Sequence, residues 1–271
     1  MNCFQLIKTV LDEIYEEIPG TEAEKDEAIA ISLEELRKQY RDIKSHDNIS
    51  YSNPSTRFAY LYRYTTSHAN LVSTCIEKSQ HLEDLFKREP FKITSLGGGP
   101  GSDLLGVIKY CDMNKISPNV KFYILDKENS WSDSWSDVDT KLNKQISASY
   151  QIFDVTAGDS SLKKHLESDL FTLIYFMSEI YSRKKSAVQY MRKLFSEAKE
   201  NSVILFIDNN DSHIYDWFNT LASENHDIVF NRDSKISLPT EEEKKDLGKY
   251  YTKFPSPKIT ADVSIRIAVK K

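Results

Sequence analysis

Four of the eight glycines in this chain fall within five residues, at Gly97, Gly98, Gly99 and Gly101. Without a Cβ atom, such a stretch can turn sharply and let a ligand approach the backbone closely. Asp103 follows in the first turn of a predicted helix, where unpaired N–H groups and the helix dipole favour negative charge. This pattern predicts a loop that binds a nucleotide, and a purely structural turn is the alternative.

Two aspartates stand where the next two predicted strands end. Asp126 closes the predicted strand 120–125, and Asp154 follows the predicted strand 150–153. In a nucleotide-binding sheet, the carboxylate after the second strand accepts hydrogen bonds from ribose hydroxyls. A carboxylate after the third strand can accept one from an adenine amino group. Each aspartate alone could be a surface residue, but three successive strand ends with suitable groups favour a nucleotide site.

A further candidate group follows the apolar run 170–177. Glu179 could bind an ammonium group or act as a general base toward a substrate N–H or O–H. Its alternative role is to cap the following helix. Tyr175 and Tyr181, on either side of it, could shape the pocket. The chain shows no catalytic triad, and none of its three cysteines stands where a covalent nucleophile is expected.

Aromatic and basic residues could receive the substrate. Tyr60, Arg63 and Tyr64 lie close together on a predicted helix before the glycine loop, and Trp131 and Trp135 follow the second predicted strand. The first group could bind an acidic or flat substrate. The tryptophans could cover an adenine ring or receive a flat substrate. Helix packing is the alternative role for both groups.

These residues need an α/β framework to bring them together. Residues 1–90 predict helices only, with a break at Pro19-Gly20 and a capping box from Thr21 to Glu24. From residue 91 to residue 223, short apolar strands alternate with helices, which predicts a parallel sheet covered on both faces. Two further strands predict an antiparallel pair at one edge. We therefore expect a helical cap over residues 1–90 and a nucleotide-binding domain over residues 91–271.

Several elements of this framework are assigned specific boundaries. The run 170–177 is predicted to be one strand buried on both faces. Residues 141–147 are predicted to be helical, and the third strand is placed at 150–153. The polar stretch 46–56 is predicted to be a loop.

About half of the chain, residues 91–210, resembles a class I S-adenosylmethionine-dependent methyltransferase. The first, third and fourth glycines of the loop match the family's G-x-G-x-G motif, whose spacing differs from the G-x-G-x-x-G of NAD enzymes. Asp126 and Asp154 match its acidic strand ends. The resemblance implies S-adenosylmethionine as the cofactor and a Rossmann-like seven-stranded sheet of order 3-2-1-4-5-7-6.

The resemblance also implies further site residues. In many of these enzymes the segment before the first strand closes over the cofactor as a lid. The family often has Asp or Glu two residues before the first glycine, where this chain has Ser95. The carboxylate near the methionine ammonium would then come from Asp103 or Glu179. The cofactor site would also include Gly98, Met177 and Ser178.

The composition indicates an ordered globular protein. Its 271 residues carry a formal net charge of −5 at pH 7, the sequence pI is about 5.8, and 39% of the residues are hydrophobic. This mild acidity provides no general attraction to nucleic acid or to an anionic membrane. No apolar run is long enough to span a bilayer, and no signal peptide or metal-binding cysteine spacing is present. We predict a cytoplasmic protein without a metal, with the nucleus as an alternative location; the sequence carries no signature of oligomeric state.

These patterns together predict methyl transfer from S-adenosylmethionine to a nitrogen or oxygen atom of a small molecule or an RNA base. Glu179 and Tyr181 are the candidate catalytic residues. The acidic pI favours a small molecule, or a partner subunit that supplies nucleic-acid contacts. Ser95 and the lack of an evident base allow a non-catalytic S-adenosylmethionine sensor or scaffold. A nucleotide-dependent enzyme on a related Rossmann fold is the third possibility.

Overall fold

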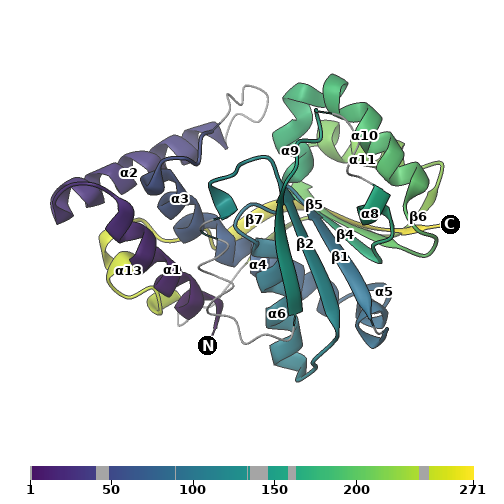
Figure 1. Ribbon diagram of the computed structural model, residues 1–271, viewed down its shortest axis with the longest axis horizontal. Helices are drawn as coiled ribbons and strands as arrows, with labels where there is room; N and C mark the ends of the chain where they lie inside the picture. Colours follow the sequence, from purple (N-terminus) through teal and green to yellow (C-terminus); the bar gives the residue numbers. More distant parts are fainter. Residues whose placement is uncertain are drawn as a thin grey trace.

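The computed structural model describes residues 2–40, 49–88, 90–132, 134, 146–157, 163–237 and 244–271. A seven-stranded sheet forms its centre, and helices lie on both faces of the sheet and beyond one of its ends (Figure 1). The strand order is β3-β2-β1-β4-β5-β7-β6, so the predicted fold class is confirmed.

The strands from β1 to β5 run parallel to one another, and β7 pairs antiparallel with both β5 and β6. Because the parallel strands all end at one edge of the sheet, the residues that follow them meet there. The strands are β1 (Phe91–Leu96), β2 (Val120–Asp126), β3 (Ile146–Ile152), β4 (Leu170–Ile174), β5 (Val203–Asn209), β6 (His226–Ser237) and β7 (Thr260–Lys270).

The helices fall before, between and after these strands. The N-terminal ones are α1 (Cys3–Glu17), α2 (Glu22–Gln39), α3 (Pro54–Tyr60), the π-helical turn η1 (Leu61–Thr65), α4 (Thr66–Glu77), α5 (Gln80–Glu83) and η2 (Asp84–Lys87). The others are α6 (Ser102–Asn114), α8 (Lys163–Leu166), α9 (Phe176–Ile180), η3 (Tyr181–Arg183), α10 (Lys184–Glu197), α11 (Ser212–Ala222) and α13 (Lys249–Lys253). None of the helices in these described ranges combines the length and apolarity needed to cross a bilayer.

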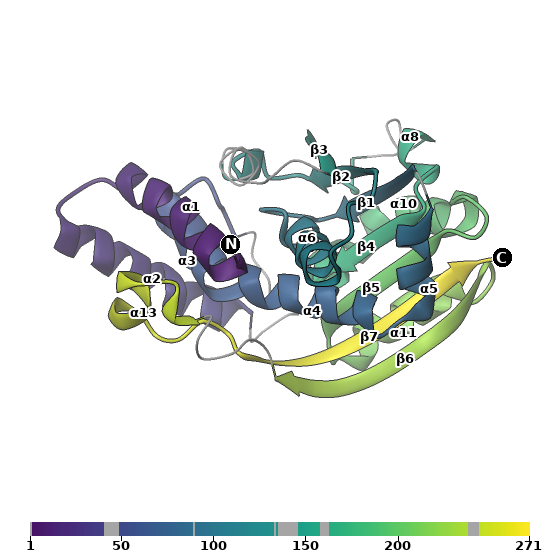
Figure 2. The ribbon, with the colours of Figure 1, turned by 90° about the horizontal axis from the view of Figure 1, so that it is seen from below.

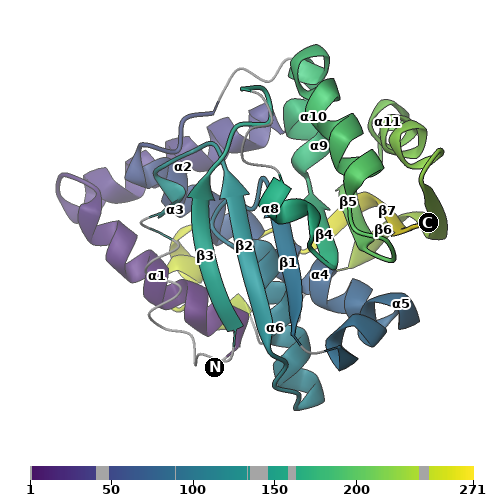
Figure 3. The same cartoon turned by 45° about the vertical axis from the view of Figure 1, so that its right-hand side comes forward.

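A separate apolar core lies on each face of the sheet, because successive side chains of a strand point to opposite faces. In β5, Val203, Leu205 and Ile207 join the core that includes α4 and α6. Ile204 and Phe206 join the core that includes α10 and α11. The helices on the two faces can be followed in Figures 1 and 3.

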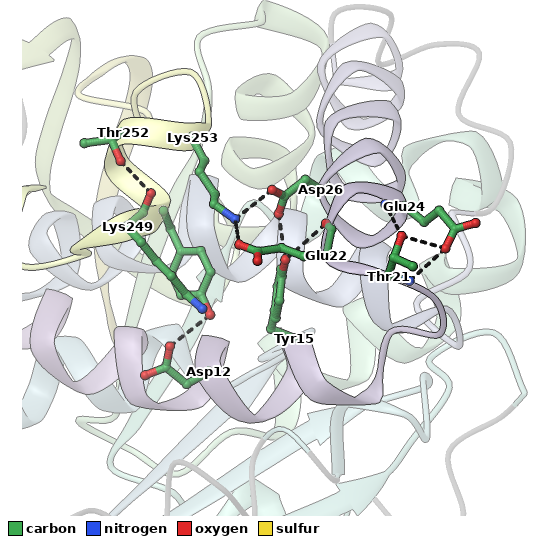
Figure 4. A network of polar contacts seen from close by, with 10 residues as sticks. Asp12, Tyr15, Thr21, Glu22, Glu24, Asp26, Lys249, Thr252 and Lys253 are labelled. Carbon is green, nitrogen blue, oxygen red and sulfur yellow. Dashed lines mark hydrogen bonds and ion pairs between the residues drawn. The ribbon is translucent and has the colours of Figure 1, made fainter.

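We call α1, α2, α3, η1 and α13 the cap. Although α13 comes late in the chain, it lies beside α1 and α2 (Figures 1 and 2). Lys253 of α13 donates hydrogen bonds to Glu22 at 2.5 Å and to Asp26 at 2.7 Å, and the Tyr250 hydroxyl donates one to Asp12 at 2.9 Å (Figure 4). The cap therefore includes part of the connection between β6 and β7, in addition to helices from residues 1–90.

The cap helices continue into α4, which packs closely against α6. A Cβ atom added at Gly106 of α6 would lie 2.6 Å from Cβ of Val72 and 2.7 Å from the carbonyl oxygen of Ala69. Glycine thus permits the two helix backbones to approach closely, and this contact joins the cap to the sheet domain.

Three predicted boundaries are wrong, each for a local reason. The run 170–177 is two elements, because β4 ends at Ile174 and α9 begins at Phe176; both are apolar because both are buried. Helix α3 begins at Pro54, inside the predicted loop 46–56, since Asn53 caps it and proline suits its first turn. The third strand starts at Ile146 because it pairs with β2, so residues 146–147 are strand rather than helix, and the rest of the predicted helix, 141–145, lies outside the described residues. It ends at Ile152, one residue earlier than predicted.

Candidate active site

The glycine loop connects β1 to α6 in a backbone shape that most residues avoid. Gly97, Gly99 and Gly101 have positive φ angles of 64°, 48° and 81°. A Cβ atom at Gly97 would also lie 2.4 Å from the ring of Phe176. Gly101 precedes α6 and provides no side-chain cap, an arrangement that suits a ligand or water at the first N–H groups of this helix.

Ser95 and Asp103 are hydrogen-bond partners beneath this loop. The buried Asp103 carboxylate accepts from the Ser95 hydroxyl at 2.6 Å and from the Thr172 hydroxyl at 2.5 Å. Burial raises the pKa of Asp103 to about 6, although both donors oppose the rise. A Cβ atom at Gly98 would lie 2.5 Å from the Ser95 oxygen. Asp103 thus ties α6 to β1 and β4, and its expected contact with a methionine ammonium stays a prediction.

A narrow cleft of about 50 Å³ lies at the carboxyl ends of the strands and brings together four of the predicted site residues: Gly97, Asp126, Asp154 and Glu179. A nucleoside-sized ligand needs more room, so side chains at its rim must move to admit one. The remaining lining residues are Leu125, Lys127, Phe153, Val155, Phe176, Ile180 and Arg183.

Asp126 is held against the glycine loop. Its Oδ2 accepts the N–H of Gly99 and its Oδ1 accepts the N–H of Glu128, each at 2.9 Å. Burial raises the pKa of Asp126, and the two backbone donors oppose that rise. Each carboxylate oxygen can accept a second hydrogen bond, so both retain capacity for ribose hydroxyls.

Asp154 is oriented by Thr156, whose N–H and hydroxyl donate to Oδ1 at 2.8 Å and 2.7 Å. Within the described part of the chain no group donates to the other oxygen, Oδ2, which can accept from an amino group. Phe153 and Val155 provide apolar walls beside it. Two acceptor carboxylates, apolar walls and a glycine loop fit an adenosine-bearing cofactor.

Glu179 lies in α9, between this cleft and the cap. Its Oε1 accepts a hydrogen bond from the Tyr40 hydroxyl at 3.3 Å. Burial raises the pKa of Glu179 to about 8, and the negative charge of Asp126 adds to the effect. The carboxyl group is therefore poised to gain or lose a proton near neutral pH.

Aromatic side chains from the cap, from the segment before α3 and from the segment after β2 gather in this region. We call Tyr40, Tyr51, Tyr60, Tyr64 and Trp131 the aromatic cluster. The Trp131 ring lies 4.6 Å from that of Tyr51 and 5.2 Å from that of Tyr60, and Tyr64 lies 5.1 Å from Tyr40. The Trp131 nitrogen lies 3.8 Å from the Cβ position of the third loop glycine, so the cluster joins the cap to that loop.

A second cavity, of about 500 Å³, lies between the cap, Tyr175 and the segment before β7. It brings together the predicted substrate residues Tyr60, Arg63 and Tyr64. It adjoins the cleft, because Tyr175 lines this cavity and its neighbour Phe176 lines the cleft. The other lining residues are Arg37, Tyr40, His68, Asn209, Ser256, Pro257, Lys258, Ile259 and Thr260.

Other predicted residues lie away from both cavities. Met177 is fully buried, and the Ser178 N–H donates to Asp208 at 2.9 Å. Tyr181 packs edge-on against Trp217 at 6.0 Å. None of the three lines the cleft or the second cavity, and their roles stay predictions. Trp135 lies outside the described residues.

Sequence patterns did not single out several residues at these cavities or in the aromatic cluster. Tyr40 ends a helix, Tyr51 lies in a polar stretch, and Lys258 follows a proline-containing loop, so each lacked a local signal. Phe176 and Arg183 could have been found from their closeness in sequence to Glu179. No group of three or more metal-ligating side chains occurs in the ranges that the structure covers.

No protein-family model matches the chain, and no curated protein matches it in sequence. Solved structures do match. A candidate RNA methyltransferase from Pyrococcus horikoshii is 13% identical, with a TM-score of 0.47, over 86% of this chain and 97% of that one. An S-adenosylmethionine-dependent methyltransferase from Methanosarcina mazei is 12% identical, with a TM-score of 0.46, over 71% and 97%. The 16S rRNA methylase ArmA is 10% identical, with a TM-score of 0.46, over 88% and 98%.

The strand order of this chain itself is that of the class I methyltransferase fold. The fold that the sequence resemblance implied is therefore confirmed.

Proposed function

We propose that this protein is an S-adenosylmethionine-dependent methyltransferase that acts on a nitrogen or oxygen atom of its acceptor. One observation carries the proposal: Gly97, Asp126, Asp154 and Glu179 line a single cleft at the carboxyl edge of a sheet with the methyltransferase strand order. Ligands of such sheets bind at this edge.

The residues of the cleft have separate roles in holding the cofactor. Asp126 accepts hydrogen bonds from ribose hydroxyls, and Asp154 accepts one from the adenine amino group. Phe153, Val155 and Ile180 contact the adenine ring. The cofactor, when bound, supplies a methyl group on a positively charged sulfur, which an acceptor atom can attack in line.

Glu179 handles the proton of the acceptor in this proposal. In its ionised form it accepts a proton from an N–H or O–H group, and the Tyr40 hydroxyl holds the carboxylate in place. A pKa of Glu179 near 8 makes its ionised form a stronger base than an ordinary carboxylate. Such a base is useful only to an acceptor that carries a proton at neutral pH.

Calorimetry tests the cofactor assignment. Titration with S-adenosylmethionine and with S-adenosylhomocysteine should show binding, and NAD should show none. Binding of NAD alone would contradict the proposal and indicate a different Rossmann enzyme.

Turnover separates an enzyme from a sensor. A labelled methyl donor is incubated with pools of metabolites and of RNA, and transfer of label to either pool supports the proposal. Cofactor binding without transfer to any acceptor would instead indicate a sensor or scaffold.

A further inference from the structure

The second cavity concentrates positive charge. Arg37, Arg63 and Lys258 line it, and no carboxylate stands among the lining residues that the structure describes. Arg37 is paired with Glu34 through two contacts of 2.8 Å, which largely balances its charge. The cavity therefore keeps two cations, Arg63 and Lys258, for which the described ranges offer no acidic partner.

Lys258 has an unusual environment for an ammonium group. It is half-buried, and none of the described carboxylates lies within ion-pair distance of it. Burial, reinforced by the positive charge of Arg63, lowers the pKa of Lys258 to about 8. The ammonium stays largely charged at neutral pH. Binding an anion would offset the free-energy cost of burying this positive charge beside Arg63.

Backbone contacts hold the two cations together. The Lys258 N–H donates to the carbonyl oxygen of Arg63 at 3.0 Å, and the Arg63 guanidinium donates to that of Ser256 at 3.3 Å. The Arg63 Nε is buried, with no partner among the described residues. Helix α13, which precedes the segment that leads into β7, is fastened to α2 by Lys253 (Figure 4) and to α1 by Tyr250. The cations thus occupy a built position rather than a mobile surface.

Aromatic rings form the rest of the wall. His68 stacks on Tyr175 with ring centres 4.4 Å apart and an interplanar angle of 23°, and Tyr60 lies 5.5 Å from Tyr64. The Lys258 ammonium lies 5.1 Å from the Tyr175 ring centre. Such rings favour a flat ligand, because aromatic faces and edges pack well against one another.

Tyr175 is held in a conformation that a bulky residue rarely adopts. Its φ angle is 56°, directly after β4, where the chain passes between the two cavities. Tyr175 is more than nine-tenths buried, and its hydroxyl has no hydrogen-bond partner in the described part of the chain. An unpaired buried hydroxyl costs free energy, so a polar group of a ligand that reached it from the second cavity would be stabilised there.

We propose that the second cavity binds the methyl acceptor, and that the acceptor is a small molecule with a flat aromatic ring and an anionic group. This inference rests on the proposed function. The ring lies among Tyr64, His68 and Tyr175, and the anion faces Lys258 and Arg63. A volume of about 500 Å³ suits a single small molecule. The anion is a carboxylate or a phosphate, which share this recognition chemistry.

Calorimetry with simple probes tests this assignment. The probes are 2-naphthoate, 2-naphthyl phosphate, the neutral 2-naphthamide and the non-aromatic cyclohexanecarboxylate. We expect one or both aromatic anions to bind at least about 10-fold more tightly than the amide and the non-aromatic acid. The stronger of the two anions identifies the charged group. Equal binding of the amide, or no binding of either aromatic anion, overturns the proposal.

Matched variants locate the binding site. Lys258→Met should weaken binding of the preferred anion about 10-fold, whereas Lys235→Met, at an exposed lysine of β6, should leave it unchanged. Tyr64→Leu should weaken binding and Tyr64→Phe should preserve it. Each variant is first checked for an unchanged thermal unfolding temperature. Undiminished binding by folded Lys258→Met overturns the proposal, as does competition for the site by a short single-stranded RNA.

The same preparations are titrated with S-adenosylhomocysteine. Loss of aromatic-anion binding with intact cofactor binding contradicts only the acceptor assignment. Absence of cofactor binding contradicts the proposed function instead, so the two failures are distinguishable.

Discussion

The hydroxyl of Tyr40 lies 3.3 Å from Oε1 of Glu179, although 139 positions separate the two residues in the chain. Tyr40 lines the second cavity and Glu179 lines the cleft, so this hydrogen bond stands where the two cavities meet. The Tyr40 hydroxyl also lies 2.9 Å from that of Tyr51. This contact between the cap and the sheet domain thus lowers the pKa of Glu179, the residue that we propose as the general base.

Tyr40→Phe should shift the pH dependence of methyl transfer to higher pH. The hydrogen bond from Tyr40 lowers the pKa of Glu179, so without it burial raises this pKa further. Initial rates measured against pH give the midpoint of the rising limb. Tyr62→Phe, at another buried cap tyrosine, serves as the control, and an unchanged midpoint in Tyr40→Phe would show that Glu179 does not govern the profile.

Glu179→Gln should lower the turnover number by about 100-fold if Glu179 is the general base. Binding of S-adenosylhomocysteine should change little, which separates loss of chemistry from loss of folding. The measurement is a single-turnover rate with the identified acceptor. A variant as fast as the natural protein would show that Glu179 does not accept the proton of the acceptor.

The same substitution should change how stability depends on pH. Burial raises the pKa of Glu179 from its usual 4.5 to about 8, so the folded protein keeps a proton that the unfolded chain releases between those values. Stability from this group is therefore present below about pH 4.5 and is lost as pH rises toward 8. Glutamine does not titrate, so Glu179→Gln lacks this loss of stability. The free energy of unfolding of the variant minus that of the natural protein should therefore increase by roughly 2–4 kcal/mol as pH rises across this window. Urea unfolding at several pH values measures it, and a difference independent of pH would contradict the burial of this carboxyl.

Asp126→Asn should weaken binding of S-adenosylhomocysteine by about 1–3 kcal/mol. The amide keeps the shape of the side chain but loses one acceptor and the negative charge that favours ribose hydroxyls. Calorimetry gives the affinity, and Asp112→Asn, at an exposed position of α6, provides the control. Equal affinities in the two variants would place Asp126 outside the site.

Gly106→Ala should destabilise the protein by about 1–3 kcal/mol. The new methyl group would collide with Val72 and with the backbone of Ala69, and this strain exceeds the gain in helix propensity of about 1 kcal/mol. Thermal or urea unfolding measures the loss. Met113→Ala, at an exposed position of the same helix, should have a small effect, and a similar small effect at residue 106 would show that α4 and α6 can separate without cost.

Local patterns in the sequence determined the sheet and the loop of this protein. Alternating apolar strands and helices specify a parallel α/β fold, because strand and helix periodicities arise from residues close in the chain. The glycines at residues 97–101 specify their loop in the same way, since positive φ angles favour glycine. At residues 170–177 the continuous apolar composition predicted one strand and concealed the boundary between β4 and α9, because both elements are buried.

The tertiary structure alone decided which distant residues share the site. Tyr40 comes from the end of α2, Glu179 from α9 and Lys258 from the segment before β7, and no local pattern links them. They meet because α13 is fastened to α1 and α2, while α4 packs against α6 at its glycine. The raised pKa of Glu179 likewise follows from burial under the cap, which no neighbouring residue in the chain could indicate.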